Sequence, residues 1–228
     1  MPVARIDAGK FWNQKILEWE QDRYAHGDAR SSRLEALAYQ FSGLPRRMEN
    51  AQRILIPNVV NRNVVELGCG SGLMAEILIE AGAASYYGVD IAQVAIEKAQ
   101  NRITLAGLDD KIRFEVGDIS SLKQFDADLV FSLGFLDWLE PQQIDTVFRL
   151  CKDTEFLHSF SERQFSFWRF IHAAYVYVAY AHRTGSYRPK YHNYEELKAK
   201  AFAHTGQSTS AFRDKAMRFG CFITTLSV

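Results

Sequence analysis

The sequence predicts an α/β protein with a doubly wound, mostly parallel sheet of seven strands and an antiparallel terminal strand. Three observations predict this fold class. Short apolar runs alternate with helical patterns between residues 63 and 160, which is typical of parallel strands joined by crossover helices. A glycine-rich turn at residues 68–72 joins the first run to the first helix. Two strand-like runs near the end of the sequence, separated by a short turn, indicate an antiparallel hairpin that closes the sheet.

Five apolar runs are the expected parallel strands, and helical patterns separate them. The runs cover residues 64–67, 86–89, 112–116, 128–133 and 156–160. The helices are expected over residues 73–81 and 93–106 and from Pro141 onwards, because proline suits the first position of a helix. In such a sheet the ligand binds at the carboxyl ends of the strands, so the site is expected there.

The segment that follows the fifth run is rich in aromatic residues. We expect a helical insertion at about residues 164–192, a helix over 194–204, and strands at about 208–213 and 219–226. The insertion contains Trp168, Phe170, Tyr175, Tyr177 and Tyr180. Such an aromatic segment fits a lid over a small ligand. A helix packed on the sheet, or in the interface of a homodimer, fits it equally well.

Residues 1–57 are expected to form a helical cap on a domain that spans residues 58–228. Apolar residues recur at helical spacing over residues 10–23, and a second helix is expected over residues 33–42. Residues 46–57 would lead from the cap into the domain. We expect the cap and the insertion to close over the ligand, with Trp19, Tyr24 and Arg47 as candidate contacts.

Composition indicates a globular protein and excludes several functions. The 228 residues are 47% hydrophobic and 24% charged, and 27 basic residues balance 27 acidic ones. A formal net charge of zero gives no long-range attraction to nucleic acid or to anionic membranes, so a small-molecule partner is favoured. His, Asp and Glu show no metal-ligand spacing, and no bound metal is expected.

The sequence also indicates a cytoplasmic location. Three widely spaced cysteines fit neither a disulfide framework nor a zinc site. Residues 1–20 lack the uninterrupted apolar core of a signal peptide. The apolar stretch at residues 165–181 contains charged side chains and is shorter than the ~20 residues that span a bilayer.

The glycine-rich turn and two later acids form the most informative pattern. Residues 66–72 read ELGCGSG, where the backbone must turn tightly and pass close to a ligand. Asp90 ends the second strand about 20 residues later, where a carboxylate can accept hydrogen bonds from ribose hydroxyls. Asp118 ends the third strand in the same way. Either acid could instead cap a helix.

Spacing distinguishes between two classes of nucleotide-binding loop. The dinucleotide pattern places a third glycine three residues after the second, and Leu73 stands at that position here. With glycines at alternate positions, the loop resembles the first motif of the class I S-adenosylmethionine-dependent methyltransferases. The resemblance spans residues 63–135. It implies S-adenosylmethionine as cofactor, with Asp90 at the ribose, Asp118 at the adenine amino group and the glycine loop against the methionine part.

The resemblance also supplies the full set of expected cofactor contacts. Glu66 would orient the loop or the cofactor's amino group, although a buried acid that binds backbone donors is equally plausible. The contacts are Glu66, Gly68, Cys69, Gly70, Gly72, Asp90, Ile91, Asp118, Ile119, Ser132 and Leu133.

The expected reaction is transfer of the sulfonium methyl group to an oxygen or nitrogen of a small-molecule acceptor, without a metal. Candidate acceptor contacts are Phe135, Trp138, His172 and Tyr175, and Trp138 is also consistent with a core position. The arrangement of three segments is similar to that of the magnesium-protoporphyrin O-methyltransferase group; they are residues 159–163, 165–180 and 188–189. This similarity does not identify the substrate of the present protein. The alternatives are a noncatalytic S-adenosylmethionine-binding protein and a nicotinamide-dependent oxidoreductase.

Two carboxylates are candidates for a general base. Glu162 ends the fifth strand and Asp137 follows the fourth, so both would lie at the ligand-binding edge. Glu162 could instead pair with an arginine and hold the insertion in place, and Asp137 could cap the helix that begins at Pro141. His172 or Tyr175 on the insertion could also supply the base.

Overall fold

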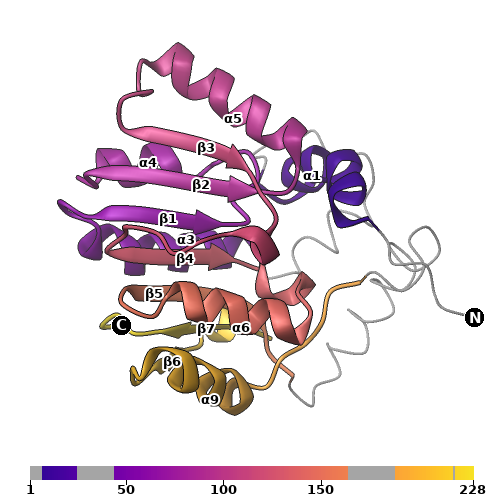
Figure 1. The fold of residues 1–228 in the computed structure, drawn as a ribbon, viewed down its shortest axis with the longest axis vertical. Coiled ribbons are helices and arrows are strands. Elements are labelled where there is room, and N and C mark those ends of the chain that lie inside the picture. The colour runs from indigo at the N-terminus through magenta and orange to yellow at the C-terminus, as the bar shows by residue number, and fades with distance from the viewer. Residues whose placement is uncertain (1–6, 25–43, 164–187, 218) are drawn as a thin grey trace, which may run out of the picture.

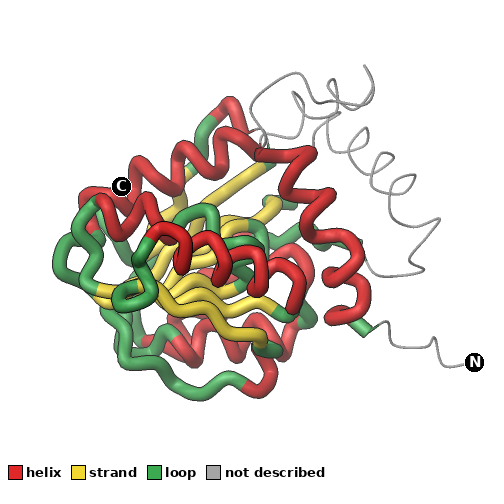
Figure 2. Tube along the Cα trace, turned by 90° about the horizontal axis from the view of Figure 1, so that it is seen from above, coloured by secondary structure: helices red, strands yellow, loops and turns green. Residues whose placement is uncertain are grey.

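The computed structural model describes residues 7–24, 44–163, 188–217 and 219–228, which form a seven-stranded sheet with helices on both faces (Figures 1 and 2). The strands are β1 (Asn63–Leu67), β2 (Ser85–Asp90), β3 (Ile112–Val116), β4 (Leu129–Leu133), β5 (Glu155–Ser161), β6 (Ser210–Phe212) and β7 (Gly220–Thr224). The helices are α1 (Ala8–Tyr24), α3 (Leu44–Leu55), α4 (Ala75–Glu80), α5 (Gln93–Ala106), α6 (Pro141–Leu150) and α9 (Tyr194–Thr205).

The strand order is β3-β2-β1-β4-β5-β7-β6. Strands β1 to β5 are parallel to one another, and β7 is antiparallel to both β5 and β6. The predicted fold class is therefore confirmed, including the single antiparallel strand. The terminal hairpin is shorter than predicted, and β7 lies between β5 and β6, so the edge position belongs to β6.

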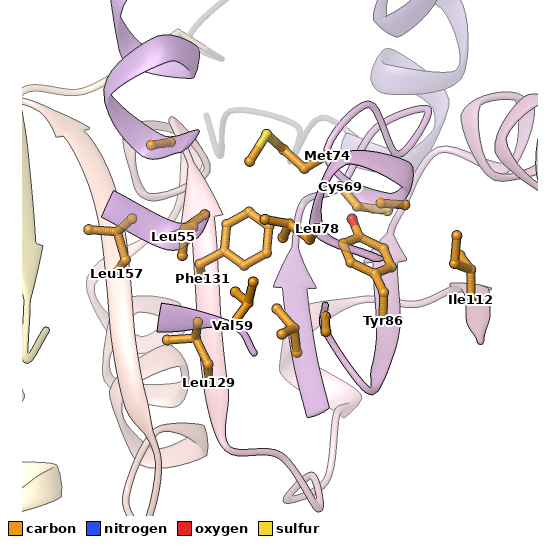
Figure 3. Packing of buried hydrophobic residues seen from close by; sticks show 14 of the residues in the cluster. Leu55, Val59, Cys69, Met74, Leu78, Tyr86, Ile112, Leu129, Phe131 and Leu157 are labelled. Atoms are coloured by element: carbon orange, nitrogen blue, oxygen red, sulfur yellow. The ribbon is translucent and has the colours of Figure 1, made fainter. Parts of the chain in front are cut away.

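Alternation along the strands produces two apolar layers, because successive side chains point to opposite faces of a sheet. Val64, Tyr86 and Phe131 point toward α3, α4 and α5, where Figure 3 shows the packing. Val65, Val130 and Phe156 point toward α6 and α9 on the other face. Both layers are buried, as expected for parallel strands covered by helices.

Local signals fix the ends of several helices. Gly107 ends α5 in the left-handed conformation, and its backbone N–H bonds to the last turn. Pro141 opens α6, whose capping box joins Glu140 and Gln143. Asn193 caps α9 by accepting a hydrogen bond from the Glu195 backbone N–H. These helices start where the sequence predicts, whereas α4 is three residues shorter than the predicted helix.

Helix α3 corrects the interpretation of residues 46–57 as a simple connection. Its apolar residues Ala51, Ile54 and Leu55 are buried in the same cluster as residues of the sheet. Helix α3 therefore packs as part of the domain, although it precedes the predicted boundary at residue 58. The second cap helix over residues 33–42 and most of the aromatic insertion lie outside the described residues.

Helix α1 lies beside the carboxyl ends of the strands, as Figure 1 shows. Ile16 packs against Ala92 and Ala95 at the start of α5. The side chain of Asn13 accepts a hydrogen bond from the Val94 backbone N–H at 3.1 Å. These contacts fix the helix over the edge where α/β proteins bind ligands.

Candidate active site

A cavity of about 790 Å³ opens at the carboxyl ends of the strands. The glycine loop, the ends of β2, β3 and β4, helix α1 and the start of α6 all contribute to its wall. Its volume lies within the ~300–1,000 Å³ that is usual for small-molecule sites. The site therefore has room for a cofactor and an adjoining small ligand.

The glycine loop is folded tightly over the end of β2. The backbone N–H groups of Gly68 and Cys69 both donate to the carbonyl of Val89, at 2.8 and 3.1 Å. Gly68 and Gly70 have φ values of 70° and 53°, in the left-handed region that side chains disfavour. A Cβ on Gly68 would also lie 2.5 Å from the ring of Phe135. Gly68, Cys69 and Gly70 all line the cavity.

Gly72 has a different position from the one predicted. It is not among the residues that line the cavity, and a Cβ there would overlap the ring of Phe114. Its φ is 69°, and its carbonyl accepts a hydrogen bond from Arg102 Nη2 at 2.6 Å. Gly72 is therefore required for the close packing of the loop on β3, behind the cavity rather than in its wall.

Asp90 connects the end of β2 to the glycine loop. Its Oδ2 accepts a hydrogen bond from the Gly70 N–H at 2.9 Å, and its Oδ1 accepts one from the Ala92 N–H at 2.8 Å. Burial raises the pKa of this carboxyl above its usual value. Ile91 and Asp90 both line the cavity. Each carboxylate oxygen can accept a second hydrogen bond, so Asp90 can hold the loop and a ligand together.

Asp118 caps a short helix and also lines the cavity. Its Oδ1 accepts a hydrogen bond from the Ser120 N–H at 2.7 Å and so caps the short helix Ile119–Ser121. The side chain is exposed at the cavity wall, next to Ile119. Within the described residues, that capping bond is the only one to its carboxylate, which leaves Oδ2 available to a ligand.

Glu66 is the most strongly perturbed acid in the cavity wall. Its side chain is 4% exposed, and the Tyr86 hydroxyl donates a hydrogen bond to its Oε2. Burial, with a smaller effect from the negative charges of Asp90 and Glu20, raises the pKa of Glu66 to about 8. Glu66 is therefore mostly protonated at neutral pH. Burial likewise raises the pKa of the adjacent Cys69 thiol.

The charges around the cavity all have one sign. In the described part of the chain, its wall contains no Lys, Arg or His. A wall of this kind favours a cationic ligand and disfavours a pyrophosphate. The acidic residues in the wall are Asp7, Glu20, Glu66, Asp90, Asp118 and Glu140.

Helix α1 contributes four residues to the wall that the sequence analysis did not single out. They are Ala8, Trp12, Ile16 and Glu20. Their spacing of four residues places them on one face of the helix, and this pattern was the available signal. Trp19 and Tyr24 belong to α1, but their side chains lie outside the described part of the structure.

Leu133, Phe135 and Trp138 line the cavity where β4 ends. The ring of Trp138 meets that of Trp12 edge to face, with centroids 4.7 Å apart, and lies 6.0 Å from that of Phe11. These rings form an aromatic wall that joins α1 to the end of β4. The other two predicted acceptor contacts, His172 and Tyr175, lie outside the described residues.

Ser132 points away from the cavity. Its hydroxyl lies 2.9 Å from His158 Nδ1 on β5, and both side chains are fully buried. Successive residues of a strand face opposite sides of the sheet, so Leu133 lines the cavity and its neighbour Ser132 does not. Burial lowers the pKa of His158 to about 3, so this histidine is neutral. Ser132 is therefore part of the packing between β4, β5 and α6.

Asp137 is held by backbone and side-chain donors outside the cavity. Its Oδ1 accepts a hydrogen bond from the Ser161 N–H and its Oδ2 one from the Ser161 hydroxyl, both at 2.7 Å. Arg47 Nη1 lies 3.6 Å from Oδ2, and both charged side chains are buried. Neither Asp137 nor Arg47 is among the lining residues. They connect α3, the end of β4 and β5.

Glu162 likewise lies away from the cavity wall. Its carboxylate accepts two hydrogen bonds from the guanidinium of Arg213, at 2.8 and 2.7 Å. The sequence leaves open two roles for Glu162, a general base or the partner of an arginine. This geometry fits the ion pair with an arginine. The structure thus gives neither predicted base a direct path to a ligand in the cavity.

The described residues cover 7–24, 44–163, 188–217 and 219–228. No helix in these ranges combines the length and the apolar character needed to cross a membrane. In the same ranges, His, Cys, Asp and Glu side chains do not gather in groups of three or more that could bind a metal ion.

Comparison with known proteins finds a methyltransferase domain in part of the chain. A model of the methyltransferase domain matches residues 64–154. Ribosomal protein L11 methyltransferase of Syntrophomonas wolfei is 31% identical over 68 residues, which are 29% of this chain. The match spans 22% of that relative, or about a fifth of its length.

Two solved structures have the same fold. Magnesium protoporphyrin IX methyltransferase from Synechocystis PCC 6803, with bound SAH, has a TM-score of 0.68 at 16% identity, over 94% of this chain and 95% of that one. An S-adenosylmethionine-dependent methyltransferase from Mesorhizobium loti has a TM-score of 0.59 at 16% identity, over 78% of this chain and 96% of that one. Residues 64–154 thus match a methyltransferase domain, and this chain shares its fold with solved S-adenosylmethionine-dependent methyltransferases.

Proposed function

We propose that this protein transfers the methyl group of S-adenosylmethionine to an oxygen or nitrogen atom of a small-molecule acceptor. The observation that supports this most directly is the glycine loop, joined to Asp90 and placed in a cavity with only acidic charges. S-adenosylmethionine contains a sulfonium and an ammonium group, which suit such a wall. The pyrophosphate of a nicotinamide cofactor would meet negative charges and no cationic side chain among the described lining residues.

The residues of the wall fit the parts of this cofactor. Asp90 would accept hydrogen bonds from the ribose hydroxyls, and Asp118 would accept one from the adenine amino group through Oδ2. Ile91 and Ile119 provide apolar surface for the adenine ring. Gly68 presents backbone close to the ligand because it has no side chain.

Catalysis in this proposal depends mainly on alignment. The bound cofactor supplies an already activated methyl group, and the protein must hold the acceptor in line with it. Helix α1 and the aromatic wall would exclude water and restrict the orientation of the acceptor. Because Asp137 and Glu162 bind Ser161 and Arg213, we do not assign either the role of general base.

The acceptor side of the cavity supports a small apolar or aromatic substrate. Phe135, Trp138 and Trp12 form its wall, and aromatic side chains provide large contact area with little loss of conformational freedom. The neutral net charge gives no support to a nucleic-acid acceptor. We further propose a cytoplasmic location, which agrees with three buried, unpaired cysteines and can be checked by cell fractionation.

Calorimetry with S-adenosylmethionine, S-adenosylhomocysteine and NAD tests the cofactor. We expect binding of the first two and no binding of NAD. The Asp90→Asn variant should bind both about ten to a hundred times more weakly, since hydrogen bonds to a charged acceptor contribute ~1.5–3 kcal/mol. Binding of NAD alone would overturn the cofactor assignment.

Mass spectrometry tests the reaction. Cell extract is incubated with the protein and isotopically labelled methyl donor, and labelled small molecules are compared with those in an Asp90→Asn reaction. A labelled product that depends on the wild-type protein supports the proposal. If the cofactor binds and label enters no molecule of any kind, the noncatalytic alternative is supported. Label found only in protein or RNA overturns the acceptor class.

A further inference from the structure

Glu20 of helix α1 has an unusual environment for a carboxylate. Its side chain is 6% exposed and lines the cavity. Its Oε1 accepts a hydrogen bond from the backbone N–H of Ser71 at 2.6 Å. Its Oε2 is buried and has no hydrogen-bond partner in the described structure. One oxygen of this buried acid is thus engaged, and the other has no partner within the described residues.

Such an arrangement is costly unless a cation completes it. A buried carboxylate loses its hydration, and the loss must be compensated by hydrogen bonds or by an opposite charge. Two further acids lie close to Glu20, because its negative charge contributes to the raised pKa of Glu66 and of Asp90. The described wall provides no Lys, Arg or His for this purpose, and a cationic ligand in the cavity would supply the compensating charge.

The position of Glu20 indicates which part of the ligand it meets. The carboxylate lies over the glycine loop, and a Cβ on Gly70 would overlap Glu20 Oε1. Asp118, which suits the adenine amino group, stands at the end of β3, at the other side of β2 from the loop. The adenine end and the Glu20 end of the cavity are therefore distinct, and the amino-acid half of the cofactor carries the ammonium group.

We propose that Glu20 Oε2 accepts a hydrogen bond from the α-ammonium group of the bound cofactor, so that helix α1 recognises the amino-acid half of the ligand. This inference rests on the proposed use of S-adenosylmethionine. It makes Glu20 a specificity-determining residue that distinguishes ligands with the charged amino group from nucleosides without it. Glu20 then binds both the loop, through Ser71, and the ligand that the loop holds.

A purely structural role would have a different signature. If Glu20 only anchors the loop through Ser71, a glutamine with the same acceptor oxygen would affect all ligands equally. The contacts of Ile16 and Asn13 with the start of α5 hold α1 in place independently of residue 20. Glu20→Gln is therefore expected to retain the docked helix, which thermal unfolding can verify.

The experiment measures the affinity of two ligands for three proteins by calorimetry. The ligands are S-adenosylhomocysteine and its analogue in which hydrogen replaces the α-amino group. The proteins are the wild type, Glu20→Gln and Glu140→Gln, the last of which removes a different negative charge from the same wall. The ratio of the two affinities within each protein cancels any general loosening of α1.

We expect the wild type to prefer the amino ligand by about ten- to a hundred-fold, since hydrogen bonds to charged groups are strong. In Glu20→Gln this preference should fall to within about three-fold, and in Glu140→Gln it should persist. Glu20→Asp retains the charge but withdraws it by one methylene, and should give an intermediate preference. This variant serves as the test if Glu20→Gln does not fold.

Two results would overturn the inference while leaving the cofactor assignment intact. One is a full preference for the amino ligand in Glu20→Gln or, if that variant is unfolded, in Glu20→Asp. The other is a wild type that binds both ligands equally. If the wild type binds neither ligand, the proposed function fails and this inference fails with it.

Discussion

Replacing Glu66 by glutamine should make the protein more resistant to unfolding than the wild type at alkaline pH. The Glu66 side chain is buried, and burial raises its pKa from 4.5 to about 8. Between these pH values the folded protein keeps a proton that the unfolded chain has released. The free energy of unfolding of the wild type therefore falls as the pH rises through this window. Glutamine is neutral at every pH and does not contribute this loss.

The size of the effect follows from the two pKa values. At ~1.4 kcal/mol per pH unit, the window between 4.5 and about 8 corresponds to at most about 5 kcal/mol, reached above pH 8. Glutamine has nearly the same shape as protonated glutamate and can accept the hydrogen bond from the Tyr86 hydroxyl. The two proteins should thus have similar stability near pH 5 and diverge steadily toward pH 9.

Urea unfolding followed by tryptophan fluorescence measures this divergence. The wild type and Glu66→Gln are compared at pH 5, 7 and 9 at constant ionic strength, without added cofactor. The difference between the two curves removes the titration of all other groups. Parallel curves from pH 5 to pH 9 would refute the reasoning, because they would show that folding does not desolvate the Glu66 carboxyl.

Three further substitutions test other features of the structure. Gly72→Ala should destabilise the protein by about 2–4 kcal/mol, and Gly107→Ala by about 1 kcal/mol. Both glycines have left-handed φ values, but only Gly72 lies against a side chain, the ring of Phe114. Equal losses of stability in urea unfolding would contradict this. In the wild type, stability should fall as the pH drops from 6.5 toward about 3, because His158 binds a proton in the unfolded chain and stays neutral in the folded one. His158→Gln should make this fall smaller. An unchanged slope between pH 7 and pH 4 in urea unfolding would count against it. Asp137→Asn should lower stability by about 1–3 kcal/mol and leave S-adenosylhomocysteine affinity and turnover within about three-fold; a turnover loss above a hundred-fold in the folded variant would restore its role as a base.

The strands and the cofactor loop could be predicted because their signals are local. Helix α5 begins and ends where the sequence indicates, since apolar periodicity and the terminal Gly107 agree. The loop at residues 68–72 follows a buried strand, and the alternating glycines need only their own backbone conformation to be recognised. Asp90 follows from its place at the end of the next strand.

The predicted site residues that do not line the cavity have partners far away in the sequence. Ser132 is turned toward His158, Asp137 is bound by Ser161, and Glu162 is paired with Arg213. The end of a strand was predictable in each case, but the face of the side chain and its partner were set by tertiary packing.

Helix α3 was missed for a different reason. It contains three arginines among its twelve residues, which obscured the apolar stripe that the sheet buries. Glu20 was missed because a charged residue on an amphipathic helix is usually solvated. Only the packing of α1 on α5 shows that this face covers the cavity.

The place of β7 in the sheet has a consequence for how the chain folds. This strand comes last in the sequence, yet it pairs with β5 on one side and β6 on the other. While a ribosome is still synthesising residues 220–224, β5 has an unpaired edge that contains Phe156 and Phe160, and β6 has no strand to join. Exposed apolar edges of this kind promote association between chains. The nascent protein is therefore most vulnerable to aggregation just before β7 is released, and chaperone dependence during synthesis should be concentrated at that stage.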